Sequence, residues 1–71
     1  MTPLKILIIG ANGQIGTELA EALAQRHGPA AVVTSDLAPQ GRLPHLRHEA
    51  LDVTDAAALA AAVKRHGITQ I

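Results

Sequence analysis

The stretch that decides the fold lies at residues 6–16 and reads ILIIGANGQIG. Its first part, residues 6–9, is branched and apolar without alternation, which is typical of a parallel strand buried on both faces. A glycine-rich turn follows at residues 10–16, and helical periodicity begins inside it at Gln14. The order of strand, glycine turn and helix predicts the first unit of a parallel α/β sheet.

Helical spacing of apolar residues continues to His27, where Arg-His-Gly-Pro at residues 26–29 predicts the helix end. The expected buried stripe of this helix consists of Ile15, Leu19, Ala20, Ala22 and Leu23. Residues 30–35 predict a second strand that ends at Asp36. Residues 37–46 contain two prolines and a glycine, and therefore predict a loop.

A short third strand is predicted at residues 49–51, followed by a second helix. Thr54 is the expected N-cap, with Asp55 in the first turn. The apolar positions of this helix recur at helical spacing, at Ala56, Leu59, Ala60 and Val63. Arg-His-Gly at residues 65–67 predicts its end, and residues 68–71 predict the opening of a fourth strand.

The predicted order is therefore β-α-β-β-α-β, which indicates a doubly wound parallel sheet with right-handed crossovers. A sheet that stops inside its fourth strand leaves apolar faces uncovered. We therefore expect the 71 residues to be the truncated N-terminal part of a larger domain, with the remainder absent from this chain.

The three glycines of the turn have the spacing GxxGxxG, after a buried strand and before a helix. In that context Gly10 permits the tight turn, Gly13 lets a pyrophosphate approach the backbone, and Gly16 lets the helix pack closely. The N–H groups at the helix start, together with the helix dipole, favour an anion. The alternative is a turn that only connects strand and helix. The candidate cofactor-binding residues of the turn are Gly10, Asn12, Gly13, Gln14, Ile15 and Gly16.

Asp36 follows Gly16 by 20 residues, at the end of the second predicted strand. A carboxylate there accepts hydrogen bonds from an adenosine ribose, with Leu37 beside it. It also repels a 2′-phosphate, so the sequence favours NAD over NADP, although Arg42 in the next loop weakens that inference. The alternative is an aspartate that only starts a turn.

Asp52 and Val53 follow the third predicted strand, where Asp52 could accept a hydrogen bond from the adenine amine. The alternative is that Asp52, Thr54 and Asp55 simply start a helix, and both can hold.

Composition excludes several classes of protein. The chain is 48% hydrophobic with 17% charged residues, so it is globular, and it has no cysteine to form a disulfide or a thiolate metal site. His45 and His48 have metal-like spacing without a third ligand, so no metal is expected. Six basic residues balance six acidic ones, which argues against nucleic acid, and no apolar run is long enough to span a membrane. We expect a cytoplasmic protein.

The segments GANGQIG at residues 10–16 and LDVTD at residues 51–55, with Asp36 between them, resemble the extended short-chain dehydrogenase/reductase family of epimerases and dehydratases. Together with HGITQI at residues 66–71, they are most similar to its branch of short-chain-type L-threonine 3-dehydrogenases. The dTDP-4-dehydrorhamnose reductases, which share the GANGQ-G turn, are the alternative branch. The resemblance covers essentially the whole chain.

The resemblance implies a Rossmann-type NAD-binding domain in an oxidoreductase, with L-threonine as substrate, 2-amino-3-oxobutanoate as product, and a homodimer as the assembly. Family members use a Tyr-x-x-x-Lys pair for proton transfer. This chain contains no tyrosine. No catalytic residue is therefore expected within residues 1–71. A different class, a non-catalytic redox sensor that binds a dinucleotide, stays open as an alternative, as does a sugar-nucleotide reductase or epimerase.

Overall fold

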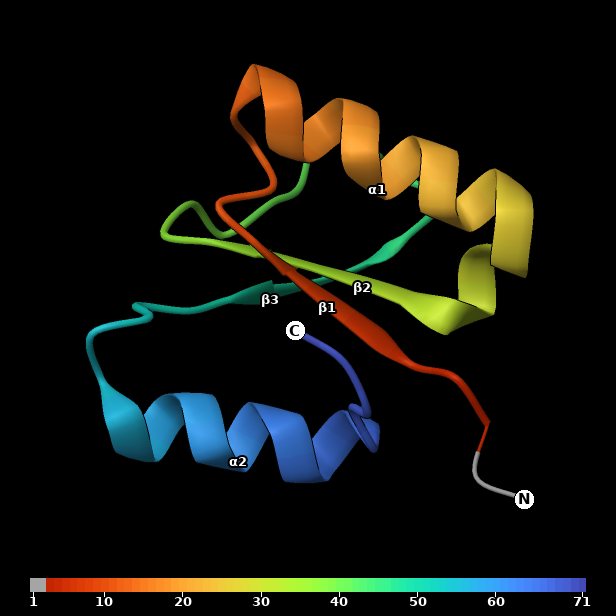
Figure 1. Cartoon of the computed structure of the whole chain (residues 1–71). Coiled ribbons are helices and arrows are strands. Elements are labelled where there is room, and N and C mark those ends of the chain that lie inside the picture. The colour runs from red at the N-terminus through yellow and green to blue at the C-terminus, as the bar shows by residue number, and fades with distance from the viewer. Residues whose placement is uncertain (1–2) are drawn as a thin grey trace.

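The computed structural model of the chain describes residues 3–71 (Figure 1). Its elements are β1 (Ile6–Ile9), α1 (Gln14–His27), a short 3₁₀ helix η1 (Pro29–Ala31), β2 (Val32–Asp36), β3 (Arg47–Ala50) and α2 (Ala56–His66). The predicted first strand, glycine turn and first helix are confirmed with their predicted bounds.

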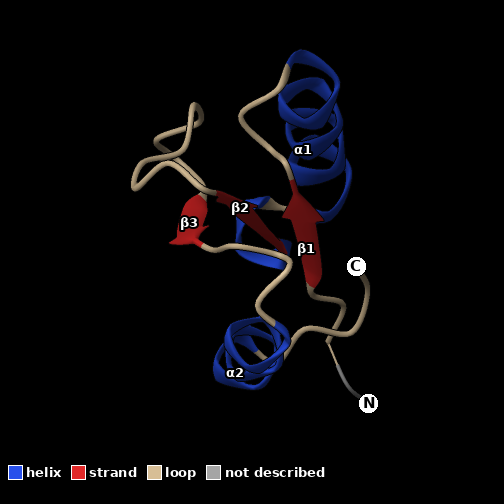
Figure 2. Ribbon diagram, turned by 90° about the vertical axis from the view of Figure 1, so that its left-hand side faces the viewer, coloured by secondary structure: helices blue, strands red, loops and turns tan. Residues whose placement is uncertain are grey.

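The strands form one parallel sheet in the order β1-β2-β3. Helix α1 covers one face of the sheet, and α2 covers the opposite face (Figures 1 and 2). Helices on both faces of a parallel sheet are the arrangement of a doubly wound fold, as predicted. The carboxyl ends of β1 and β2 lie side by side, because Ile9 pairs with Ser35.

Residues 68–71 run along the free edge of β1. Gln70 forms a parallel bridge with Ile6, and the N–H of Leu7 donates to Gln70 O at 2.9 Å. The N–H of Thr69 donates to Lys5 O at 2.8 Å. The position and direction expected of a fourth strand are therefore present, but the pairing amounts to an isolated bridge and not to a strand.

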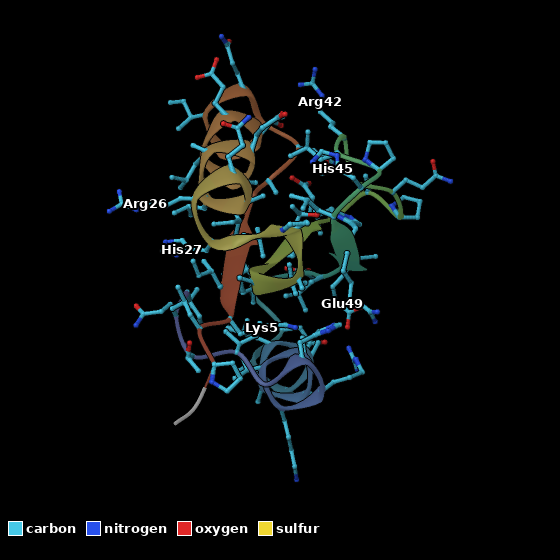
Figure 3. All side chains as sticks on the ribbon, turned by 90° about the vertical axis from the view of Figure 1, so that its right-hand side faces the viewer. Lys5, Arg26, His27, Arg42, His45 and Glu49 are labelled. Carbon is cyan, nitrogen blue, oxygen red and sulfur yellow. The ribbon has the colours of Figure 1, made fainter. Side chains whose placement is uncertain are left out.

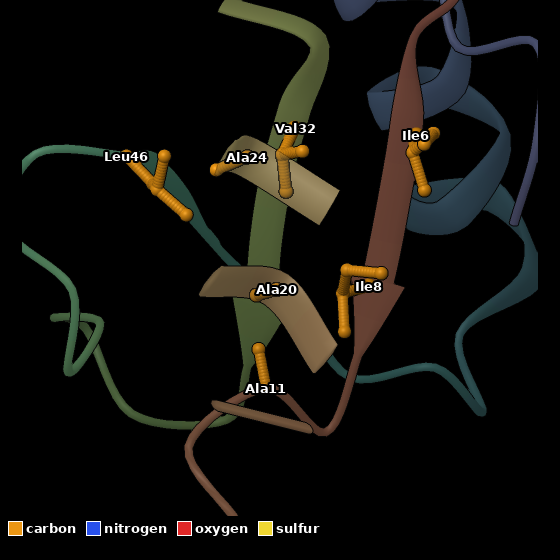
Figure 4. Packing of buried hydrophobic residues seen from close by; sticks show 7 residues of the cluster. All are labelled: Ile6, Ile8, Ala11, Ala20, Ala24, Val32 and Leu46. Carbon is orange, nitrogen blue, oxygen red and sulfur yellow. The ribbon is translucent and has the colours of Figure 1, made fainter. Parts of the chain in front are cut away.

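The core lies on both sides of β1. Seven buried residues pack between α1, its preceding turn and the sheet (Figure 4): Ile6, Ile8, Ala11, Ala20, Ala24, Val32 and Leu46. A second cluster lies on the α2 side and contains Leu7, Val33, Leu51 and Ala62. Successive residues of β1 therefore enter opposite clusters, which explains its continuous apolar sequence.

Three predicted boundaries are wrong. Pro29–Ala31 forms a 3₁₀ helix with proline at its start, so the second strand begins at Val32. The third strand is Arg47–Ala50, a polar strand at the edge of the sheet. Its pairing with β2 starts at Arg47, two residues before the predicted start of the strand at residue 49. The N-cap of α2 is Asp55, not Thr54, because the Asp55 carboxylate accepts a hydrogen bond from Ala58 N–H at 3.1 Å.

The predicted buried stripes are also partly wrong. In α1, the side chains of Ile15 and Leu19 are 82% and 47% exposed, while Ala20 and Ala24 face the sheet. In α2, Ala62 is buried and the partly buried Ala58, Leu59 and Val63 pack against the same cluster, whereas Ala56 and Ala60 are exposed. Small alanine side chains let each helix approach the sheet closely. The buried face of each helix is therefore the one that fits the sheet best, and not the one with the largest apolar side chains.

Candidate functional site

The glycine turn between β1 and α1 is closed by backbone contacts that a larger residue would block. Gly10 has φ of +71°, a conformation that glycine adopts without steric cost. A Cβ on Gly16 would lie 2.5 Å from Gly10 O and 2.9 Å from Ala11 Cα. The absence of a side chain at Gly16 therefore lets the first turn of α1 rest against the residues that leave β1.

The N-terminus of α1 presents unpaired backbone donors. The first hydrogen bond of the helix runs from Thr17 N–H to Gly13 O at 2.9 Å, so the N–H groups of Gln14, Ile15 and Gly16 have no acceptor within the helix. Among the side chains of residues 3–71 none caps this end, and the first turn of α1 holds no acidic residue. A Cβ on Gly13 would meet only Gly10 O, at 3.5 Å. The open space and the donors fit a pyrophosphate group.

Asp36 lies beside this turn at the end of β2. Its Oδ2 accepts a hydrogen bond from Asn12 N–H at 3.0 Å, and its Oδ1 accepts one from Leu37 N–H at 2.8 Å. The carboxylate is thus oriented by backbone donors from both the turn and its own strand end. The structure therefore brings Asp36 and Leu37 together with the glycine turn. Contact of Asp36 and Leu37 with an adenosine ribose stays a prediction.

The loop at residues 37–46 folds back onto the same turn. Asn12 Nδ2 donates to Gln40 O at 3.1 Å, and Asn12 Oδ1 accepts from Arg42 N–H at 3.1 Å. Arg42 Nη1 donates in turn to Asn12 O at 3.3 Å. Sequence reasoning identified the loop but missed this contact, because the partners are 28–30 positions apart and no local pattern announces them.

His48 fixes the base of the same loop, whereas the sequence placed it within a plain surface loop. It lies on β3, where Nδ1 is 2.8 Å from Oγ1 of the buried Thr34, and Nε2 is 3.0 Å from Ala38 O. A Cβ on Gly41 would come within 2.8 Å of His48 Nδ1. The imidazole thus ties the sheet to the loop, and glycine at position 41 leaves space for it.

Asp52 and Val53 follow β3, as predicted, but Asp52 makes local contacts. Its Oδ1 accepts hydrogen bonds from Thr54 N–H at 2.9 Å and Thr54 Oγ1 at 2.6 Å. These bonds lower the pKa of the Asp52 carboxyl below its ordinary value. The hydrogen bonds from Thr54 therefore support the interpretation that Asp52 helps to start the helix. Contact of Asp52 and Val53 with an adenine stays a prediction.

Other features of residues 3–71 lie away from this site. A hollow of about 560 Å³ opens at the amino ends of the strands, where Lys5, Val32 and Arg47 contribute to its wall. Within the described range, no group of three or more His, Cys, Asp or Glu residues could hold a metal ion. Neither helix there has the length and apolar character that a bilayer crossing demands.

The fold and the turn together define a doubly wound α/β unit in which a glycine turn and an uncapped helix start lie beside a strand-end carboxylate. The sequence profile of the NAD dependent epimerase/dehydratase family matches residues 6–71, and the chain belongs to that family. A search of curated proteins found no match.

Solved structures give a finer comparison. The chain is 64% identical to a GalE-like L-threonine dehydrogenase from Cupriavidus necator in its holo form, with a TM-score of 0.91 over 93% of this chain and 21% of that one. It is 62% identical to a partial consensus L-threonine 3-dehydrogenase, with a TM-score of 0.87 and the same coverage. Against L-threonine dehydrogenase from Clostridium difficile it shows 34% identity and a TM-score of 0.86, over 100% of this chain and 23% of that one. The chain thus spans about a fifth of the length of these proteins.

Proposed function

We propose that this chain is the N-terminal, NAD-binding portion of an L-threonine 3-dehydrogenase. The observation that carries the proposal is the pairing of the uncapped start of α1 with the Asp36 carboxylate through Asn12. Identities of 62–64% with two threonine dehydrogenases support the substrate and favour this branch over sugar-nucleotide enzymes. The activity belongs to a longer protein, in which this chain forms the first part of the Rossmann-type domain.

The residues of this chain bind and orient the cofactor. Backbone donors at Gln14, Ile15 and Gly16 hold the pyrophosphate, and Asp36 accepts hydrogen bonds from the adenosine ribose. Asp52 and Val53 contact the adenine. Bound NAD supplies the nicotinamide that accepts a hydride from the carbon bearing the substrate hydroxyl. Proton transfer falls to residues outside the 71 present here, which include no tyrosine.

Membership of the same family supports further expectations for the whole protein. It acts as a homodimer on a small-molecule substrate, in the cytoplasm, without a metal ion. The absence of cysteine suits a reducing compartment.

Two assays of the full-length protein test the proposal: formation of NADH with L-threonine, and conversion of a nucleotide sugar followed by analysis of its products. The second assay needs product analysis, because epimerisation forms no net NADH and reduction consumes the reduced cofactor. We expect NADH with L-threonine alone. NAD binding without turnover of either substrate would favour the redox-sensor alternative, and turnover of the nucleotide sugar would favour the other branch. Absence of NAD binding in calorimetry would refute the proposal as a whole.

A further inference from the structure

His48 holds the loop at residues 37–46 through a hydrogen bond whose direction is fixed. The carbonyl oxygen of Ala38 can only accept, so Nε2 of His48, at 3.0 Å, carries the proton and donates. In the neutral ring Nδ1 is then the acceptor, and it lies 2.8 Å from Oγ1 of the buried Thr34. The imidazole is therefore held by β2 on one side and holds the loop on the other.

The backbone of the loop fits closely around this ring. A Cβ on Gly41 would lie 2.8 Å from Nδ1 and 3.1 Å from Cγ of His48, and 3.1 Å from Oγ1 of Thr34. Any side chain at position 41 would therefore displace the ring or the loop. This close fit is independent of the hydrogen bonds, and it indicates the same pairing of the loop with the imidazole.

Neighbouring residues of β3 point to opposite faces of the sheet. The side chain of Glu49 pairs with Arg65 of α2, whereas that of His48 contacts the loop. Figure 3 shows Glu49 toward α2, and the loop residues Arg42 and His45 on the α1 side. His48 therefore contacts the loop on the face of the sheet that also carries α1.

The anchored Ala38 lies next to a donor that orients the Asp36 carboxylate. Leu37, which directly precedes Ala38, donates from its N–H to Asp36 Oδ1 at 2.8 Å. The other oxygen, Oδ2, accepts from the N–H of Asn12 at 3.0 Å. A shift of Ala38 would therefore disturb one of the two backbone donors of this carboxylate.

We infer that His48 is a positioning residue for the cofactor: it holds the chain that follows Asp36 in the path that orients the candidate ribose-binding carboxylate. The inference rests on the proposed function, which gives Asp36 that role. His48 acts through Ala38 and need not touch the ligand. It removes conformational freedom that the loop would otherwise lose when NAD binds. Loss of this contact should therefore weaken NAD binding and leave the chemical step unchanged.

Two variants of the full-length protein separate the loop contact from the sheet contact. His48→Asn keeps an oxygen near the position of Nδ1, which can accept from Thr34, but its side chain is too short to reach Ala38 O. His48→Gln reaches the position of Nε2 with an N–H donor and is the matched control. Steady-state kinetics with NAD and L-threonine, together with calorimetry with NAD, are measured for both variants and the wild type.

We expect His48→Asn to raise the KM and the Kd for NAD about fivefold, as the loss of one net hydrogen bond predicts. Its kcat and its KM for L-threonine should stay within about twofold of the wild type, because only cofactor binding has been weakened. His48→Gln should keep the wild-type KM for NAD. A role in stability alone would lower the Tm of His48→Asn without changing its KM for NAD, and that result would overturn the inference.

An equal rise of the KM for NAD in both variants would also overturn the inference, because the bond to Ala38 would not be its cause. Absence of NAD binding by the wild type would instead refute the proposed function. If the wild type binds NAD without oxidising L-threonine, the Kd for NAD alone decides the role of His48. Should His48→Asn fail to fold by circular dichroism, Gly41→Ala replaces it, because its methyl group displaces the ring from the loop. The Kd for NAD should rise in that variant too, and an unchanged Kd would overturn the inference.

Discussion

The backbone N–H of Asn12 donates a hydrogen bond to Oδ2 of Asp36 at 3.0 Å, across 24 positions of the sequence. This bond joins the turn after β1 to the end of β2. The group that would hold a pyrophosphate and the group that would hold a ribose are therefore one connected unit. The side chain of Asn12 extends the unit to the loop at residues 37–46.

Replacement of the Asn12 side chain should loosen that loop. In Asn12→Ala the amide of Arg42 loses its acceptor, and we expect its hydrogen exchange to accelerate about fivefold, since a net hydrogen bond contributes about 1 kcal/mol. Asn12→Asp is the control, because it keeps an oxygen for Arg42 N–H and loses only the donor to Gln40 O. Unchanged exchange in Asn12→Ala would show that the loop does not depend on this side chain.

The glycines at positions 13 and 16 should respond differently to valine. A Cβ at Gly16 would lie 2.5 Å from Gly10 O, so Gly16→Val must move backbone, and we expect a loss of about 1–3 kcal/mol in the free energy of unfolding. Urea unfolding measures that loss.

Gly13→Val should instead fold and lose its affinity for NAD. Its φ of −70° suits an L-residue, and its Cβ meets only Gly10 O at an ordinary 3.5 Å. The side chain occupies the space that the pyrophosphate needs. Calorimetry with NAD, beside a circular dichroism spectrum, measures both effects. Normal binding by a folded Gly13→Val would show that the phosphate position is wrong.

Acid should destabilise the fold through His66, in the last turn of α2. Burial lowers the pKa of its imidazole, as do the charges of Arg65, Arg47 and Lys5, although Glu49 lies 3.6 Å from Nε2. Nε2 has no hydrogen-bond partner in the described part of the chain. Below its ordinary pKa of 6.5, His66 binds a proton more readily in the unfolded state than in the folded one. Stability contributed by the neutral ring is therefore present above that pH and is lost as the pH falls through it.

His66→Gln should remove this part of the pH dependence. Urea midpoints at about pH 5 and about pH 8, the limits between which histidine changes charge, should differ less in the variant than in the wild type. His45→Gln, at an exposed loop position, is the matched control and should keep the wild-type difference. Equal pH dependence in all the proteins would contradict the assignment to His66.

The isolated 71-residue chain should be inactive, marginally stable and prone to association. Its exposed apolar side chains include Ile15, Leu19 and Ile71. Within residues 3–71, the outer edge of β1 is paired only through the bridge from Ile6 to Gln70. Thermal unfolding followed by circular dichroism measures the stability, and sedimentation velocity measures the association. A monomer with a cooperative transition above about 50 °C, within the range of mesophile domains, would contradict the expectation that the chain is part of a larger domain.

Local sequence was sufficient to predict β1, the glycine turn and the bounds of α1. Continuous branched residues, three spaced glycines and a Gly-Pro stop each act within a few residues, so short-range sterics decide them. The same holds for the alternation that sends Ile6 and Leu7 to opposite clusters. Asp36 could also be selected from its spacing after the turn, because the length of a β-α-β unit is nearly fixed.

The tertiary structure alone decided where β3 runs, which helix faces are buried and what the loop at residues 37–46 contacts. β3 reads RHEA and has no apolar signature, because an edge strand is held by backbone bonds to β2. The exposed Ile15 and the buried Ala20 show that docking on the sheet selects a helix face by fit. The bonds from Asn12 to Gln40 and Arg42 join segments 28–30 positions apart, so they depend on the sheet that holds the carboxyl ends of β1 and β2 side by side and not on any local pattern.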